Sequence, residues 1–151
     1  MTKIQITTTI SAPIETVFNL SRNIDIHLLT TQQTNEKAIA GRTSGLIELN
    51  ETVTWRGKHF GFYQNHKSII PKMDFPIYFV DEMLEGSFKS FRHEHSFKFE
   101  DGKTIMSDDI FYEAPFGIFG KLFDTIILEK YMTSFIKKRN EIIKNLAENP
   151  Q

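Results

Sequence analysis

The chain has no cysteine among its 151 residues, which excludes disulfide bonds, thiolate nucleophiles and thiolate metal ligands. Its formal net charge is only −1, and its one compact basic run is Lys137-Lys138-Arg139. Nucleic-acid binding requires a broad basic surface, so no nucleic-acid partner is expected. No apolar run reaches the roughly 20 residues that span a bilayer, so no stable membrane insertion is expected either. Without a signal-peptide pattern, the expected location is the cytoplasm.

Phenylalanine is abundant, with fourteen residues. The phenylalanine side chain is large and wholly apolar, so this number predicts aromatic walls around a core or a hollow. The length fits one domain over residues 1–151, because the chain shows no linker, internal repeat or low-complexity segment.

The C-terminal part of the chain predicts one long amphipathic helix from Phe116 to Leu146. Such a helix would run for about 28 residues, or about 42 Å at 1.5 Å per residue, which is enough to cross a sheet. Lys137-Lys138-Arg139 is expected on its solvent-exposed side. Apolar residues recur at the three-to-four spacing of one buried helical face: Phe119, Leu122, Phe123, Ile126, Ile127, Met132, Phe135, Ile136, Ile142, Ile143 and Leu146.

The rest of the chain reads as strands, interrupted early by two short helices. Residues 2–10 alternate as a strand does, and helices are predicted from Ser11 and over Asn23 to Leu29. The order predicts an α+β fold with an antiparallel sheet of about seven strands around the long C-terminal helix. Because a wide sheet twists, the helix cannot seal all of it, and a cavity should result. After a turn at residues 41–45, further strands are predicted at 48–56, 63–70, 76–85, 88–99 and 104–113.

Several local motifs resemble the SRPBCC superfamily, which includes START lipid-transfer domains, pollen-allergen-like proteins and polyketide cyclases. The resemblance is to a bacterial branch of small stand-alone cyclase/dehydrase-like or ligand-binding proteins, and it covers nearly the whole chain. It implies a helix-grip fold with an apolar ligand cavity, whose mouth commonly lies near Phe116, Phe119 and Phe123. It implies no reaction, because one fold hosts many functions. The motifs lie at residues 11–18, 51–55, 59–61, 79–82, 86–88, 93–97, 106–108 and 115–117.

The most specific local pattern lies in the strand predicted at 88–99. Alternate residues of a strand share a face, so His93 and His95 lie between Phe91 and Phe97 on an otherwise aromatic side. The neighbouring strands carry Asp81 and Asp108 by the same alternation, which would give the cavity one polar zone. The expected ligand-binding residues are Trp55, His59, Phe79, Asp81, Phe91, His93, His95, Met106, Asp108, Phe119 and Phe123.

Three interpretations of this polar zone are open. The aspartates could fix the histidine tautomers in a buried network, because buried polar groups pair. The zone could instead orient the polar head of a ligand. Catalysis or metal binding is the third interpretation, but a lone His-x-His is a weak metal motif and no nucleophile is marked. We therefore expect no metal and no cofactor, and a hydrogen bond from Asp81 or Asp108 to at least one imidazole.

The function that fits these features is the binding of a hydrophobic or amphipathic small molecule between the sheet and the C-terminal helix. An alternative is a cyclase/dehydratase-type enzyme for a polyketide-like or aromatic substrate, which needs a His or Asp required for turnover but not for binding. A protein-interaction module is the third possibility, and it requires a filled core with an exposed apolar patch. No feature of the sequence indicates an oligomeric state.

Overall fold

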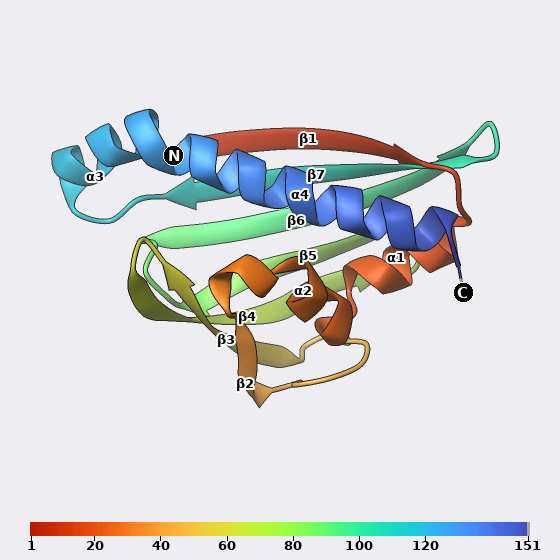
Figure 1. Ribbon diagram of the computed structural model, residues 1–151, viewed down its shortest axis with the longest axis horizontal. Coiled ribbons are helices and arrows are strands. Elements are labelled where there is room, and N and C mark those ends of the chain that lie inside the picture. Colours follow the sequence, from red (N-terminus) through yellow and green to blue (C-terminus); the bar gives the residue numbers. More distant parts are fainter. Residues whose placement is uncertain (151) are drawn as a thin grey trace.

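A computed structural model describes residues 1–150. Its elements follow the order predicted from the sequence: a strand, two short helices, six further strands and a C-terminal helical segment (Figure 1). Their bounds are β1 (Thr2–Ile10), α1 (Ile14–Ser21), α2 (Ile24–Thr30), η1 (Gln32–Thr34), β2 (Lys37–Gly41), β3 (Thr52–His59), β4 (Phe62–Asp74), β5 (Tyr78–Glu85), β6 (Ser90–Glu100), β7 (Lys103–Glu113), α3 (Gly117–Phe123), η2 (Asp124–Leu128) and α4 (Glu129–Glu148).

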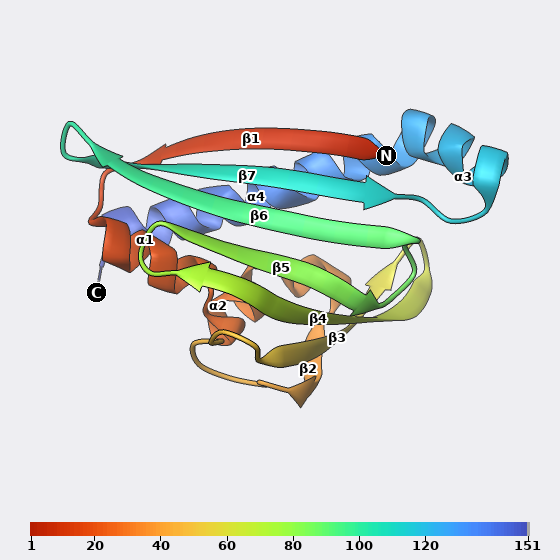
Figure 2. The ribbon, with the colours of Figure 1, turned by 180° about the vertical axis from the view of Figure 1, so that it is seen from behind.

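The seven strands form one antiparallel sheet in the order β1-β7-β6-β5-β4-β3-β2. The first strand therefore pairs with the last, and the others follow as a meander. Helix α4 runs along one face of the sheet, and the view from behind shows the strands with no helix in front of them (Figure 2). The helix-grip fold predicted from the sequence is confirmed.

Helix α4 packs on the sheet through one side. Its buried residues Ile136, Arg139, Asn140, Ile143 and Ala147 recur at intervals of three or four, the spacing of one helical face. They lie against β1, α1 and α2. No helix among residues 1–150 combines the length and apolar character needed to span a bilayer.

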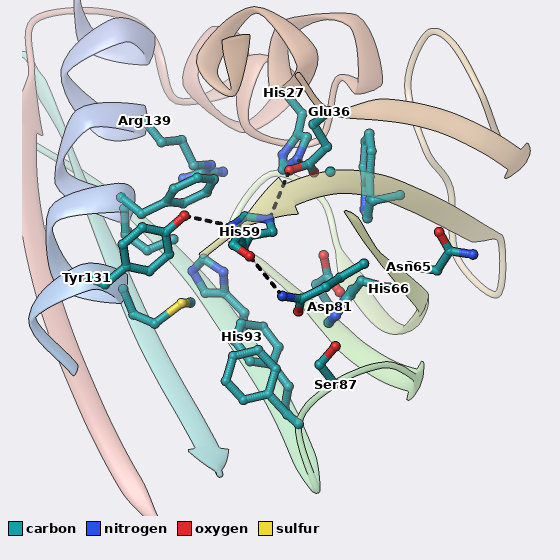
Figure 3. Close-up of a pocket in the computed structure, with 18 of the residues that line it drawn as sticks. His27, Glu36, His59, Asn65, His66, Asp81, Ser87, His93, Tyr131 and Arg139 are labelled. Atoms are coloured by element: carbon teal, nitrogen blue, oxygen red, sulfur yellow. Dashed lines mark hydrogen bonds and ion pairs between the residues drawn. The ribbon is translucent and has the colours of Figure 1, made fainter. Parts of the chain in front are cut away.

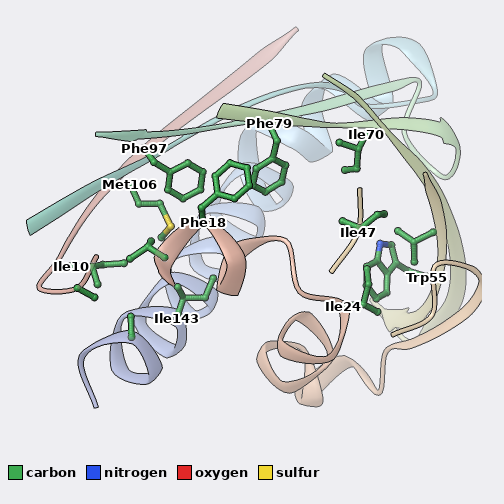
Figure 4. Close-up of a cluster of buried hydrophobic side chains, with 14 residues drawn as sticks. Ile10, Phe18, Ile24, Ile47, Trp55, Ile70, Phe79, Phe97, Met106 and Ile143 are labelled. Carbon is green, nitrogen blue, oxygen red and sulfur yellow. The ribbon is translucent and has the colours of Figure 1, made fainter. Parts of the chain in front are cut away.

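Most of the buried apolar residues gather in a cluster between the sheet and the helices (Figure 4). At its centre the Phe18 ring from α1 lies 5.2 Å from the Phe79 ring and 5.1 Å from the Phe97 ring. A smaller cluster under the start of α4 includes Ile110, Tyr112 and Leu128. Aromatic packing thus joins α1 to the middle of the sheet.

The predicted buried stripe is wrong for the first half of the helical segment. Phe119 is 79% exposed, Leu122 60% and Ile126 56%. Helix α3 lies past the end of the sheet, so nothing beneath it can bury these side chains (Figure 1). The π-helical turn η2 then shifts the helical face before α4 begins.

A second correction concerns the basic run, because Arg139 is only 5% exposed. Its guanidinium donates to Asn140 Oδ1 at 2.8 Å and to the Ser21 carbonyl at 3.3 Å. Lys137 and Lys138 are exposed as predicted. The arginine therefore belongs to the interior and not to the solvated face.

Candidate functional site

A cavity of about 820 Å³ lies between the sheet and the helices (Figure 3). The register of β4 against β5 shifts twice, between Lys67 and Ser68 and between Ile69 and Lys72. Such bulges bend a strand and increase its twist, so the sheet curves away from α4 and leaves a hollow. The aromatic residues of its wall are Trp55, Phe60, Phe62, Phe79, Phe88, Phe91, Phe116, Phe119, Phe123, Tyr131 and Phe135.

One polar centre of the cavity is built on Asp108, which is fully buried. His93 Nε2 lies 2.7 Å from Asp108 Oδ1, and Asn140 Nδ2 donates to Oδ2 at 2.7 Å. Arg139 lies 3.7 Å from Oδ1. His95 Nδ1 lies 3.1 Å from the same oxygen, but it is poorly aligned and has no hydrogen-bond partner among residues 1–150. We call these five residues the Asp108 network, and it confirms the predicted aspartate–imidazole hydrogen bond.

The charges of the Asp108 network follow from burial and pairing. Burial alone would raise the pKa of Asp108, but the His93 hydrogen bond, the His95 contact and the Arg139 charge hold it well below its usual value. Burial lowers the pKa of His95 to about 3, and the neighbouring His93 acts in the same direction. Burial also lowers the pKa of Arg139. The centre is thus a buried Asp108–Arg139 ion pair beside a neutral His95 imidazole.

The two histidines stack on one another and on the aromatic wall. The His93 and His95 rings are 3.7 Å apart, and His95 lies 4.1 Å from Phe79. Ligand atoms of His93, His95 and Asp108 lie within 4.8 Å of one another. However, Asp108 already accepts bonds on both oxygens, and the adjacent Arg139 charge would repel a cation. The chemistry of this centre therefore disfavours a metal ion.

A second polar centre, formed by Glu36, His27, His59 and Tyr131, lies elsewhere on the cavity wall. His27 Nε2 lies 2.8 Å from Glu36 Oε1, and His59 Nδ1 lies 2.7 Å from the Tyr131 hydroxyl (Figure 3). His59 Nε2 is 3.9 Å from Glu36 Oε2. We call these residues the Glu36 cluster. A chain of polar contacts thus connects α4, β3 and α2 across the cavity.

Burial and hydrogen bonding together set the protonation of the Glu36 cluster. Although burial opposes it, the hydrogen bond with His27 holds the pKa of Glu36 below its ordinary value. Burial lowers the pKa of His59 and raises that of Tyr131. Glu36 is therefore a carboxylate beside a neutral His59 and a neutral Tyr131 phenol.

The structure places nine of the eleven sequence-predicted site residues in the cavity wall: Trp55, His59, Phe79, Asp81, Phe91, His93, His95, Phe119 and Phe123. Met106 and Asp108 lie outside it. Met106 is fully buried under α1, with its sulfur 3.4 Å from Ser21 Oγ, and Asp108 lies behind the His93 imidazole.

The sequence did not indicate the other polar members of the two centres, which are His27, Glu36, Tyr131, Arg139 and Asn140, nor His66 elsewhere in the wall. His27 and Glu36 lie on or after short elements that carry no clear period. Tyr131 and Arg139 lie on α4, four positions before the predicted apolar residue Phe135 and three positions after Ile136. Helical spacing was therefore a signal that could have indicated Tyr131 and Arg139.

No protein-family model matches the sequence, and neither does any curated protein. Similar solved structures include TTHA0849 from Thermus thermophilus, with 18% identity over 94% of this chain and 97% of that one and a TM-score of 0.73. Ginseng major latex-like protein 151 from Panax ginseng is 15% identical over 98% of both chains, with a TM-score of 0.71. The KanY protein is 10% identical over 98% of both chains, with a TM-score of 0.75. The chain thus shares the fold of these proteins, the helix-grip fold that its sequence motifs indicated.

Proposed function

We propose that the protein holds a hydrophobic or amphipathic small molecule in the cavity between the sheet and α4. The observation that carries this proposal is a hollow of about 820 Å³ with a mainly apolar wall that is rich in aromatic side chains. Ligand sites are typically concave and apolar, with a few converging polar groups, and the Asp108 network and Glu36 cluster supply such groups. A protein-interaction module would be expected to have a filled core instead.

The exposed aromatic side chains at and just before the start of α3 support the same proposal, because they also line the cavity. Phe116 is 84% exposed and Phe119 79% exposed, yet both belong to its wall. The cavity therefore opens beside α3. We propose that this apolar surface is the mouth through which the ligand passes.

Filling part of the cavity should weaken ligand binding. Met132→Trp adds an indole to the cavity wall from α4, and it should weaken the binding of a neutral dye such as Nile red about tenfold or more, equivalent to about 1.4 kcal/mol. Fluorescence titration measures the dissociation constant. Ser134→Trp is the matched control, because Ser134 is exposed on the same helix and lies outside the wall. Wild-type protein that binds no dye, or equal binding by the two variants, would contradict the proposal.

If the ligand passes through this mouth, a smaller side chain there should change the rates of binding and release. Phe119→Ser should speed both association and dissociation of the dye several-fold, because it removes a ring from the opening without touching the polar centres. Ile118→Ser is the control: Ile118 is also 79% exposed but lies outside the cavity wall. Stopped-flow fluorescence measures both rates. If the two substitutions change the rates equally, Phe119 is not part of a gate.

A cyclase/dehydratase-type enzyme remains the second candidate, and the Glu36 cluster is the observation that favours it. A neutral phenol 2.7 Å from an imidazole is a hydrogen-bonding pair of the kind used in general acid–base catalysis. An enzyme would require Tyr131→Phe to stop turnover while ligand binding persists. Binding that survives without any turnover in the wild-type protein supports the binding function.

A further inference from the structure

One carboxylate oxygen of the cavity wall has no hydrogen-bond partner in the part of the chain that the structure describes. Asp81 lies on β5 and reaches the cavity beside His66 and His93 (Figure 3). Its Oδ1 is shielded from solvent and has no hydrogen-bond partner among residues 1–150. Buried polar atoms are normally paired, so an orphaned carboxylate oxygen in a ligand cavity calls for a partner that the chain itself does not provide.

The other charged groups of the wall are already engaged. Arg22 lies 2.8 Å from Glu48, and Arg139 lies beside Asp108. Glu36 binds His27. Arg22, Arg139 and Glu36 therefore each have a counterpart of their own.

Of the two imidazoles beside Asp81, His93 is hydrogen-bonded to Asp108, and His66 does not supply the missing charge. Burial lowers the pKa of His66, although Asp81 and Glu36 oppose the shift, so His66 is neutral at neutral pH. No ion pair joins Asp81 to a cation among residues 1–150, although Arg139 attracts it from farther away. Such a site penalises an anionic ligand and favours a cationic one.

The surroundings of Asp81 also suit a cation. Phe79 and Phe91 line the wall from the neighbouring positions of β5 and β6, and the faces of aromatic rings attract ammonium groups. Building on the proposed function, we propose that the ligand is an apolar amine whose protonated nitrogen binds Asp81. The apolar part of the molecule then occupies the aromatic remainder of the cavity.

A matched ligand series tests this proposal. Dodecylamine, dodecanol and dodecanoate share one alkyl chain and differ in the charge of the head group, and each is titrated against the protein loaded with Nile red at neutral pH. The dissociation constant of the amine, measured by displacement of the dye, should be at least about tenfold lower than that of the carboxylate, with the alcohol between them. Asp81→Asn should weaken the amine about tenfold and leave the alcohol unchanged.

Glu82→Gln is the control variant. Glu82 follows Asp81 on β5, outside the cavity wall, and pairs with Arg92 at 3.0 Å. The substitution makes the same change in net charge, and it should leave the order of the three ligands unchanged. Equal binding of amine and carboxylate by the wild type would overturn the amine proposal alone, and so would an unaltered amine affinity in Asp81→Asn. A wild type that binds neither the dye nor any ligand would instead overturn the proposed function.

Discussion

Asp108→Asn should lower the free energy of unfolding by about 3–5 kcal/mol, the usual cost of removing one partner from a buried ion pair. Asparagine has nearly the same shape, so packing is preserved. It cannot accept hydrogen bonds on both terminal atoms, however, whereas Asp108 accepts one from His93 and one from Asn140. It also leaves the buried Arg139 without its nearest counter-charge.

A double-mutant cycle separates the charge effect from the lost hydrogen bonds. Arg139→Met removes the buried cation, so the double variant Asp108→Asn/Arg139→Met should be less destabilised than the sum of the single variants by about 1–3 kcal/mol. Urea unfolding followed by circular dichroism measures each value.

Asp109→Asn provides the control, because Asp109 is next in the chain and pairs with the exposed Lys3 at 3.5 Å. Its cost should stay within about 1 kcal/mol, because Lys3 is 52% exposed and Asp109 22% exposed, so water screens the pair. If Asp108→Asn costs no more than Asp109→Asn, the Asp108 network does not stabilise the fold.

The site residues that could be predicted from the sequence are those whose direction follows from the alternation of side chains along a strand. His93 and His95 could be placed because side-chain alternation is a local property of β6, and their cavity-facing side was fixed by the aromatic residues around them. Asp81 was placed by the same alternation on β5. The order of the elements, and with it the fold, followed from turns and periods of the same kind.

The burial of Arg139 and Asn140 was missed because the residues around them are basic and polar. They lie three and four positions after Ile136, so the helical period places them on the buried side of α4. The adjacent lysines made the run look like a solvated surface. The polar character of these residues was itself the signal of an internal ion pair, because charged residues at core positions are retained only with partners.

The α3 segment shows the opposite error. Its apolar spacing was correct, but burial also requires a surface to pack against, and the sheet ends before α3 begins (Figure 1). The contacts of Glu36 with His27 and His59 likewise join distant parts of the chain. Contacts of this kind depend on the tertiary structure, so the local pattern of one sequence does not predict them.

Acidification should destabilise the protein, and His95 should account for much of the effect. The folded pKa of His95 is lowered from 6.5 to about 3 because its imidazole is buried. Between these two values the unfolded chain binds a proton that the native state does not, so stability falls as the pH falls through this window. Each pH unit is worth about 1.4 kcal/mol, which gives a loss of about 2 kcal/mol between pH 6.5 and pH 5.

His95→Phe should remove this part of the pH dependence. The new ring can keep the stacking on Phe79, and Asp108 retains its bonds to His93 and Asn140. Burial lowers the pKa of His59 and His66 as well, so a smaller slope of the same sign should remain. The depressed pKa of Asp108 makes its contribution complete above its unfolded pKa of 3.8, so that contribution is constant from pH 5 to 7.

Urea unfolding at intervals between pH 5 and 7 measures the slope for each protein. Ser96→Ala is the control, because Ser96 lies next to His95 on β6, outside the cavity wall, and does not titrate. Its slope should equal that of the wild type. A wild-type slope that persists in His95→Phe would mean that the imidazole takes up its proton inside the fold, and that Asp108 stabilises a charged His95 in spite of the nearby Arg139.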